Sequence, residues 1–155
     1  MKKKIDLEEV RAFIENTSED TKIYIGGDST RYKRNGVWFA RYCTVVIIHF
    51  EGKHGCKLFW DFSEERDYDQ KKDKPRVRLM TEVMKTAQLY IDLEESIDIR
   101  DCEIHLDLNK DEKHGSNCVV KEAIGYVRGM CNVVPMIKPN AFAAATAADH
   151  LLKVG

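Results

Sequence analysis

The alternation of hydrophobic and polar residues predicts that the chain begins with a helix. Val10 and Ile14 recur at helical spacing. Asp6 and Glu9 stand three residues apart, which is the spacing of a capping box at a helix N-terminus. We therefore expect a short helix over residues 6–15, ended by the polar stretch "NTSEDT".

Three runs rich in β-branched and aromatic residues follow and predict strands over residues 22–27, 37–50 and 56–62. Asn35-Gly36 lies just before the second run and is a hairpin signal, although the polar stretch 31–36 is longer than a two-residue turn. The short connections favour an antiparallel meander of these three strands.

The second half of the chain alternates helices with strands. Pro75 suits the first turn of a helix, and apolar residues at helical spacing continue from it for about twenty residues. Strands are expected over 102–109 and 132–139, where Pro135 favours a sheet edge. Two more helices are expected over "CVVKEAIGYVRGM" and "AFAAATAADHLL", with Ser116 or Asn117 capping the first and Asn140 the second.

This order of elements predicts an α/β fold. The expected sheet is mixed and five-stranded, with an antiparallel three-strand meander plus two parallel strands, flanked by helices. The 155 residues show no internal repeat and no interdomain linker, so we expect a single domain over 1–155 with its core over about 20–152.

Composition narrows the class of protein. Hydrophobic residues make up 43% and charged residues 33% of the chain, as in an ordinary soluble domain, and the net charge of −1 leaves room for a local basic patch. No apolar run approaches the roughly 20 residues of a membrane span, and the basic N-terminus lacks the apolar region of a secretory signal. The five scattered cysteines form no C-x-x-C pair, so we expect neither a zinc site nor disulfides, and a cytoplasmic location.

Two aspartates stand where predicted strands end. Asp28 follows the strand over 22–27, and Asp107 lies near the end of the strand over 102–109. If these strands are parallel neighbours, both side chains emerge at the same sheet edge, where α/β proteins usually bind ligands. Two adjacent carboxylates repel unless a proton or a cation lies between them, and oxygen ligands favour Mg²⁺ or Mn²⁺ over Zn²⁺. The alternatives are a turn residue at Asp28 and a loop cap at Asp107.

The chain resembles a known family through four segments: "GGDST", "HLDLN", "SNCVVKEAIGYVRGM" and "KPNAFAAATAADHL". They resemble the YkuK family (DUF458) of ribonuclease H-like proteins, over about residues 20–152. The segment "ATAADHLL" is also similar to the final helix of RuvC-type junction resolvases, with Thr146 in place of the first aspartate of that motif. The resemblance implies a ribonuclease H-like fold, which is shared by nucleases, transposases, resolvases and inactive binding domains.

The resemblance also implies a metal site that is the catalytic site, formed by Asp28, Glu82, Asp107 and Asp149. Its expected chemistry is two-metal hydrolysis of phosphodiester bonds, with Mg²⁺ or Mn²⁺, in RNA, an RNA/DNA hybrid or branched DNA. Glu82 is the only acidic residue in the first half of its helix. The alternatives are a surface helix residue at Glu82 and a solvated residue at Asp149.

A basic stretch follows Asp28 directly and comprises Arg31, Tyr32, Lys33 and Arg34. Arginine and lysine are the usual contacts to phosphates, and a tyrosine can stack on a base, so these residues are candidates for nucleic-acid binding. The alternative is a solvated charged loop. The sequence thus favours a metal-dependent nuclease, with a non-catalytic nucleic-acid-binding or protein-interaction domain on the same fold as the second hypothesis; no pattern predicts an oligomeric state.

Overall fold

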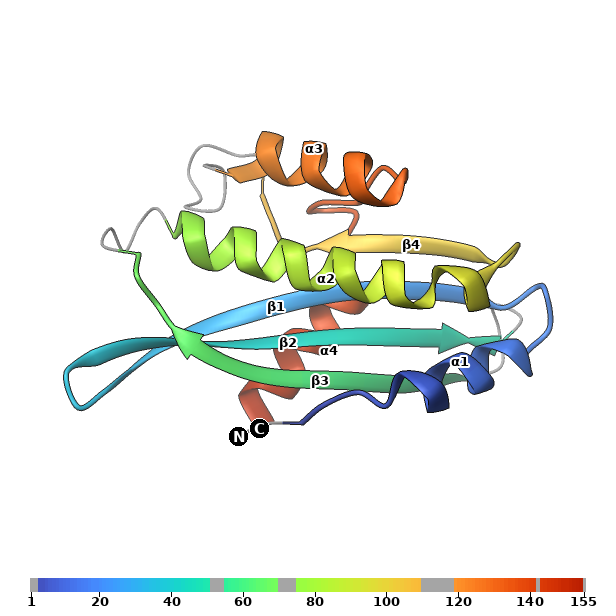
Figure 1. Ribbon diagram of the computed structural model, residues 1–155, viewed down its shortest axis with the longest axis horizontal. Helices are drawn as coiled ribbons and strands as arrows, with labels where there is room; N and C mark the ends of the chain where they lie inside the picture. Colours follow the sequence, from blue (N-terminus) through green and yellow to red (C-terminus); the bar gives the residue numbers. More distant parts are fainter. Residues whose placement is uncertain (1–2, 51–54, 70–74, 110–118, 142, 155) are drawn as a thin grey trace.

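The computed structural model describes residues 3–50, 55–69, 75–109, 119–141 and 143–154. In these ranges one mixed sheet lies between helices (Figure 1). The strands are β1 (Lys22–Arg34), β2 (Val37–His49), β3 (Cys56–Arg66) and β4 (Asp101–Leu106). The helices are α1 (Leu7–Glu15), α2 (Arg76–Ile97), α3 (Val120–Cys131) and α4 (Ala143–Val154).

The strand order is β3-β2-β1-β4. β2 is antiparallel to both β1 and β3, which confirms the predicted meander. β4 lies parallel to β1, with Lys22 opposite Asp101 and Gly27 opposite Leu106. The α/β class and the mixed sheet are therefore confirmed, and the first and fourth strands are neighbours.

The prediction of a fifth strand over 132–139 is wrong, because the sheet has four strands in the described residues. This segment does lie beside β4: the Met136 N–H donates to the Ile104 carbonyl at 2.8 Å, and its carbonyl accepts from the Leu106 N–H at 2.9 Å. The Lys138 N–H also donates to the Leu108 carbonyl at 3.0 Å, but the chain turns directly afterwards, with the Asn140 N–H donating to the Ile137 carbonyl at 2.8 Å. The result is a single bridged residue at the sheet edge.

The β1–β2 hairpin is much longer than the sequence indicated. β1 continues past residue 27 to Arg34, and only Asn35 and Gly36 separate it from β2. Both turn residues have positive φ, 52° and 80°, which a tight two-residue turn matched to strand twist requires. The hairpin consequently extends beyond the end of β4 (Figure 1).

The helix termini follow capping rules, locally for α1 and at longer range for α2. The Asp6 carboxylate accepts from the N–H groups of Glu8 and Glu9, as the predicted capping box implies. For α2, the carboxylate of Asp69 accepts from the N–H groups of Val77 and Arg78, both at 2.9 Å. The caps expected for α3 at residues 116 and 117 lie outside the described residues.

The core has two layers, one on each face of the sheet. On one face, Ile23 and Ile25 of β1 pack with residues of α2 such as Val83. On the other, the core includes Cys43 of β2 and Ala148 of α4. Each fully buried aliphatic side chain stabilises the fold by about 1.5–3 kcal/mol. None of the helices in the described ranges is both long enough and apolar enough to cross a membrane.

Candidate functional site

Asp28 lies inside β1, opposite Cys43 of β2, and its side chain is buried. Strand alternation directs neighbours to opposite faces, and Ser29 contacts α2. Asp28 therefore projects to the face covered by α4. The alternative of a turn residue at Asp28 is wrong, because the strand continues through it.

Asp107 directly follows β4, and Asp28 directly follows Gly27, which is opposite the last residue of β4, Leu106. The two side chains are close enough to share a hydrogen bond. Burial, followed by the negative charge of Asp107, raises the pKa of Asp28 to about 8. Asp28 thus retains its proton near neutral pH.

Glu82 lies on α2 and is only 3% exposed, so the alternative of a surface helix residue is wrong. The Ser29 hydroxyl donates to Glu82 Oε2 at 2.6 Å and accepts from Arg78 at 2.7 Å. Burial, and then the charge of Asp28, raises the pKa of Glu82 well above its ordinary value. Glu82 therefore lies within electrostatic range of the aspartate pair, on the α2 side.

Asp149 on α4 is more open, with 48% of its side chain exposed and an ion pair to Lys153 at 2.8 Å. Its charge is the smallest contribution to the raised pKa of Asp28, so it lies near the pair without joining it. A second lysine, Lys138, reaches Asp107 with its Nζ 2.6 Å from Oδ1, and this hydrogen bond raises the pKa of Lys138.

Asp107 and Asp149 lie near Asp28, whereas Glu82 lies on the α2 side of the sheet, so the four predicted acids do not form a closed ligand set. In the parts of the chain that the structure describes, no group of three or more His, Cys, Asp or Glu residues is arranged to hold a metal ion. Asp28 and Asp107 are in direct contact, while the charge of Asp149 raises the pKa of Asp28 and the charge of Asp28 raises the pKa of Glu82.

Four residues of this site were missed by the sequence reasoning: Ser29, Arg78, Lys138 and Lys153. The pairing of Asp149 with Lys153 has a local signal, because side chains four residues apart meet on a helix. The other contacts join residues far apart in the sequence, for which single-sequence patterns carry no signal.

The basic hairpin residues divide between structural and open positions. Arg31 Nε is 2.6 Å from Asp67 Oδ2, and that carboxylate is fully buried. Tyr32 stacks on Phe39 with ring centroids 5.8 Å apart. Lys33 and Arg34 form no ion pair with any described residue and instead lie over the rings of Trp38 and Phe39.

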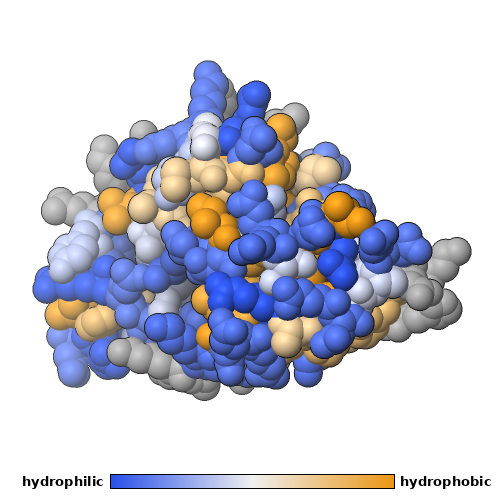
Figure 2. Space-filling model, turned by 45° about the vertical axis from the view of Figure 1, so that its right-hand side comes forward, coloured by the Kyte–Doolittle hydropathy of each residue, from blue (hydrophilic) through white to orange (hydrophobic). Residues whose placement is uncertain are grey.

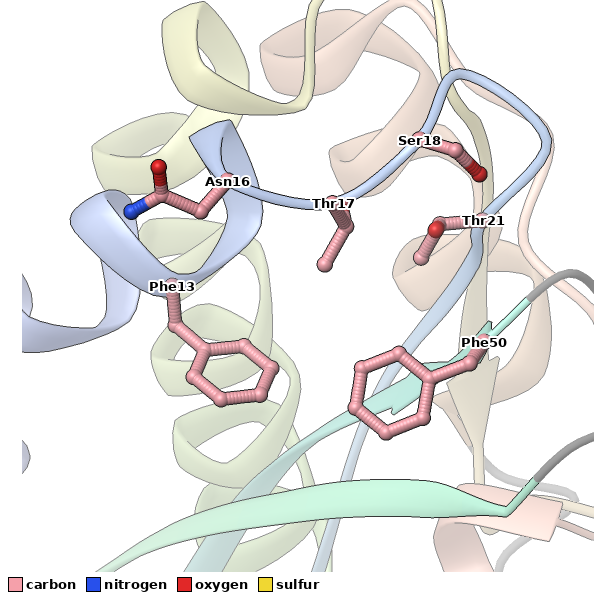
Figure 3. A pocket seen from close by; sticks show the side chains of 6 residues that line it. All are labelled: Phe13, Asn16, Thr17, Ser18, Thr21 and Phe50. Atoms are coloured by element: carbon pink, nitrogen blue, oxygen red, sulfur yellow. The ribbon is translucent and has the colours of Figure 1, made fainter.

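The other end of the sheet holds a small open pocket of about 290 Å³ (Figure 3). Its lining is polar and aromatic without a charged side chain: Phe13, Asn16, Thr17, Ser18, Thr21 and Phe50. It lies beyond the start of β1, whereas Asp28 is the middle residue of that strand. On the face of the molecule in Figure 2, hydrophobic residues lie in small groups among hydrophilic ones.

Comparison with known proteins gives one match. The model of a family described as ribonuclease H-like matches residues 6–153. A search of curated proteins found no match, and a search of solved structures found none either.

Proposed function

Because the chain belongs to the ribonuclease H-like family, we propose that it is a divalent-metal-dependent nuclease. Its substrates would be RNA, an RNA/DNA hybrid or branched DNA, in which it would hydrolyse phosphodiester bonds. The observation that carries the proposal is the contact between the buried Asp28 of β1 and Asp107, which directly follows the parallel strand β4. The family match supports the coarser statement, a nucleic-acid-related function.

The acid site fits a hard divalent cation in its chemistry. A buried carboxylate that keeps its proton at neutral pH is stabilised by any cation that can replace this proton. All the candidate ligands, Asp28, Glu82, Asp107 and Asp149, are carboxylates, the donors that Mg²⁺ and Mn²⁺ prefer. When bound, such cations would lower the pKa of a water and stabilise the leaving oxygen of the phosphodiester.

The chain's own residues would prepare this site. Asp28 would give up its proton as the cation binds, and Asp107 and Asp149 would exchange their lysine partners for it. Ser29, held by Arg78, would keep the Glu82 carboxylate oriented through its 2.6 Å hydrogen bond. Lys33 and Arg34 would bind phosphates of the substrate.

We also propose a narrower family membership for the chain. The four motif segments support membership of the YkuK group, with a final helix like that of RuvC-type resolvases. We propose a single domain over residues 1–155 that acts in the cytoplasm, supported by the uninterrupted family match and by the free cysteines at positions 43, 56, 102 and 131.

The test is cleavage of a panel of labelled nucleic acids by the purified protein, with Mn²⁺ or with EDTA. We expect cleavage that requires Mn²⁺ and is lost in Asp28→Asn. Asp101→Asn is the matched control, since it makes the same change on the exposed end of β4, away from the pair. Absence of both cleavage and Mn²⁺ binding by calorimetry would refute the proposal.

A second candidate is a non-catalytic nucleic-acid-binding or protein-interaction domain. The observation in its favour is that Lys138 and Lys153 already neutralise Asp107 and Asp149. This candidate predicts that Asp28→Asn and Asp107→Asn leave binding intact, whereas charge reversal at Lys33 and Arg34 removes it.

A further inference from the structure

The end of the long hairpin forms one wall of an open groove of about 530 Å³. Trp38 of β2 lines the groove from the hairpin, and Tyr68 lines it from the segment that follows β3. From this groove we infer a binding site for the bases of single-stranded nucleic acid, with Tyr68 and Trp38 as stacking residues. The inference rests on the proposed action on nucleic acid and names the form of the substrate.

The two aromatic side chains are accessible to solvent and are not part of the core. Tyr68 is 67% exposed, and the Arg66 guanidinium lies 5.1 Å from its ring centroid. Trp38 is half-buried, and the Arg31 guanidinium lies 4.2 Å from its ring. Aromatic rings next to arginine are what binders of single strands use to stack successive bases.

The ring of Trp38 is held in place by a chain of specific contacts. The Arg31 guanidinium that lies over it is bound to the Asp67 carboxylate and to the Asp69 carbonyl, at 2.6 and 2.9 Å. The Trp38 carbonyl also accepts from the Asp67 N–H at 2.9 Å. This wall of the groove is therefore preorganised, which lowers the entropic cost of binding.

The charge of the hairpin suits a polyanion. Residues 31–41 contain four basic side chains and no acidic one. Arg31 and Arg41 are used in ion pairs with Asp67 and Glu64. Lys33 and Arg34, which form no ion pair within the described residues, are the cations that remain for phosphates.

The two aspartates that line the groove do not oppose this charge. The Asp67 carboxylate is fully buried against Arg31. The Asp69 carboxylate accepts the N–H groups of Val77 and Arg78 at the start of α2. Both negative charges are thus compensated by partners within the protein.

The position of the groove relates it to the acid site. Lys33, which pairs with Trp38 across the hairpin, lies five residues along β1 from Asp28, or roughly 17 Å at strand spacing. A strand held at the groove can therefore continue toward the acids. Stacking needs bases with free faces, which a duplex does not offer, so the groove favours single strands over duplexes.

The test is fluorescence anisotropy with a labelled single strand of about twelve nucleotides, in EDTA so that no metal-dependent cleavage occurs. We expect Tyr68→Ala to weaken binding about tenfold and Tyr68→Phe to retain it. Lys33→Ala should lower the slope of log affinity against log salt by about 0.7, the value for one phosphate contact. Lys121→Ala, at an exposed position of α3, is the control for the lysine change.

The outcomes separate this inference from the proposed nuclease. Unchanged binding by Tyr68→Ala, no binding by the wild type, or tighter binding of the matching duplex would each overturn the groove. If Mn²⁺-dependent cleavage persisted in these cases, the nuclease proposal would be retained without the groove. Loss of binding in Tyr68→Ala, together with a wild type that neither cleaves nor binds Mn²⁺, would support the groove and overturn the nuclease.

Discussion

Gly27 of β1 and Thr86 of α2 approach so closely that a Cβ on the glycine would lie 2.6 Å from the threonine Oγ1. The same Cβ would lie 3.3 Å from the Cys43 carbonyl, so two sides are blocked. The glycine before Asp28 thus allows α2 to pack directly onto β1. Glu82, one turn earlier on α2, is thereby brought beside Ser29.

Gly27→Ala should therefore destabilise the fold by about 1–3 kcal/mol through overpacking, measured by urea unfolding. The loss should shrink in a Thr86→Ala background, which removes the clashing oxygen. Gly125→Ala is the control: nothing lies within 4 Å of its added Cβ, and on α3 alanine should stabilise by up to about 1 kcal/mol. Equal effects at positions 27 and 125 would contradict the predicted clash.

The carboxylate pair should make stability depend on pH. The pKa of Asp28 is about 8 in the folded chain against an ordinary value of 3.8, so between these values the folded state holds the extra proton. The free energy of unfolding should accordingly fall as pH rises from about 4 to about 8, by at most about 1.4 kcal/mol per pH unit. Glu82, whose pKa is also raised, acts in the same direction.

Asp28→Asn removes the titrating group and should flatten this dependence. The difference in unfolding free energy between the variant and the wild type should shift in favour of the variant as the pH rises from 5 to 8. Urea unfolding of the metal-free protein measures this difference. Asp101→Asn is again the matched control and should leave the slope unchanged. If the free energy of unfolding of the wild type and of Asp28→Asn changed equally between pH 4 and pH 8, the buried pair would not control the pH dependence.

The cap of α2 should contribute more to the free energy of unfolding than an exposed ion pair on the same helix does. Asp69→Ala leaves the N–H groups of Val77 and Arg78 without their acceptor and should cost about 1–2 kcal/mol of unfolding free energy. Arg76→Ala removes the ion pair with Glu122, in which both side chains are about half exposed, and should cost less than about 1 kcal/mol. Thermal unfolding of the two variants gives the order, and the reverse order would refute the capping role.

Lys138 should compete with a bound cation for Asp107, because its Nζ lies 2.6 Å from the carboxylate. Lys138→Met should therefore raise the affinity for Mn²⁺ several-fold, measured by isothermal titration calorimetry. The effect on folding should stay below about 1 kcal/mol, since the lysine side chain is half exposed. Lys121→Met controls for the lost charge, and weaker Mn²⁺ binding by Lys138→Met would contradict the competition.

The sequence by itself determined those features that depend on neighbouring residues. The Asp6 cap, the three-strand meander and the Asn35-Gly36 turn follow from local propensity and hydrophobic period. The placement of Asp28 and Asp107 on neighbouring strands follows from the order of elements. The cap, the meander and the turn are confirmed because each depends on backbone preferences that act over a few residues, whereas the pairing of β1 with β4 joins segments far apart in the sequence.

Only the tertiary structure decided which side chains meet. A turn directly after Ile137 left a single bridged residue in place of a fifth strand, and a tight turn let β1 run on to Arg34. Glu82 is buried because Gly27 admits α2, and Lys138 finds Asp107 from a segment far along the chain. Contacts of this kind depend on the packing of distant elements, whose geometry no local pattern encodes.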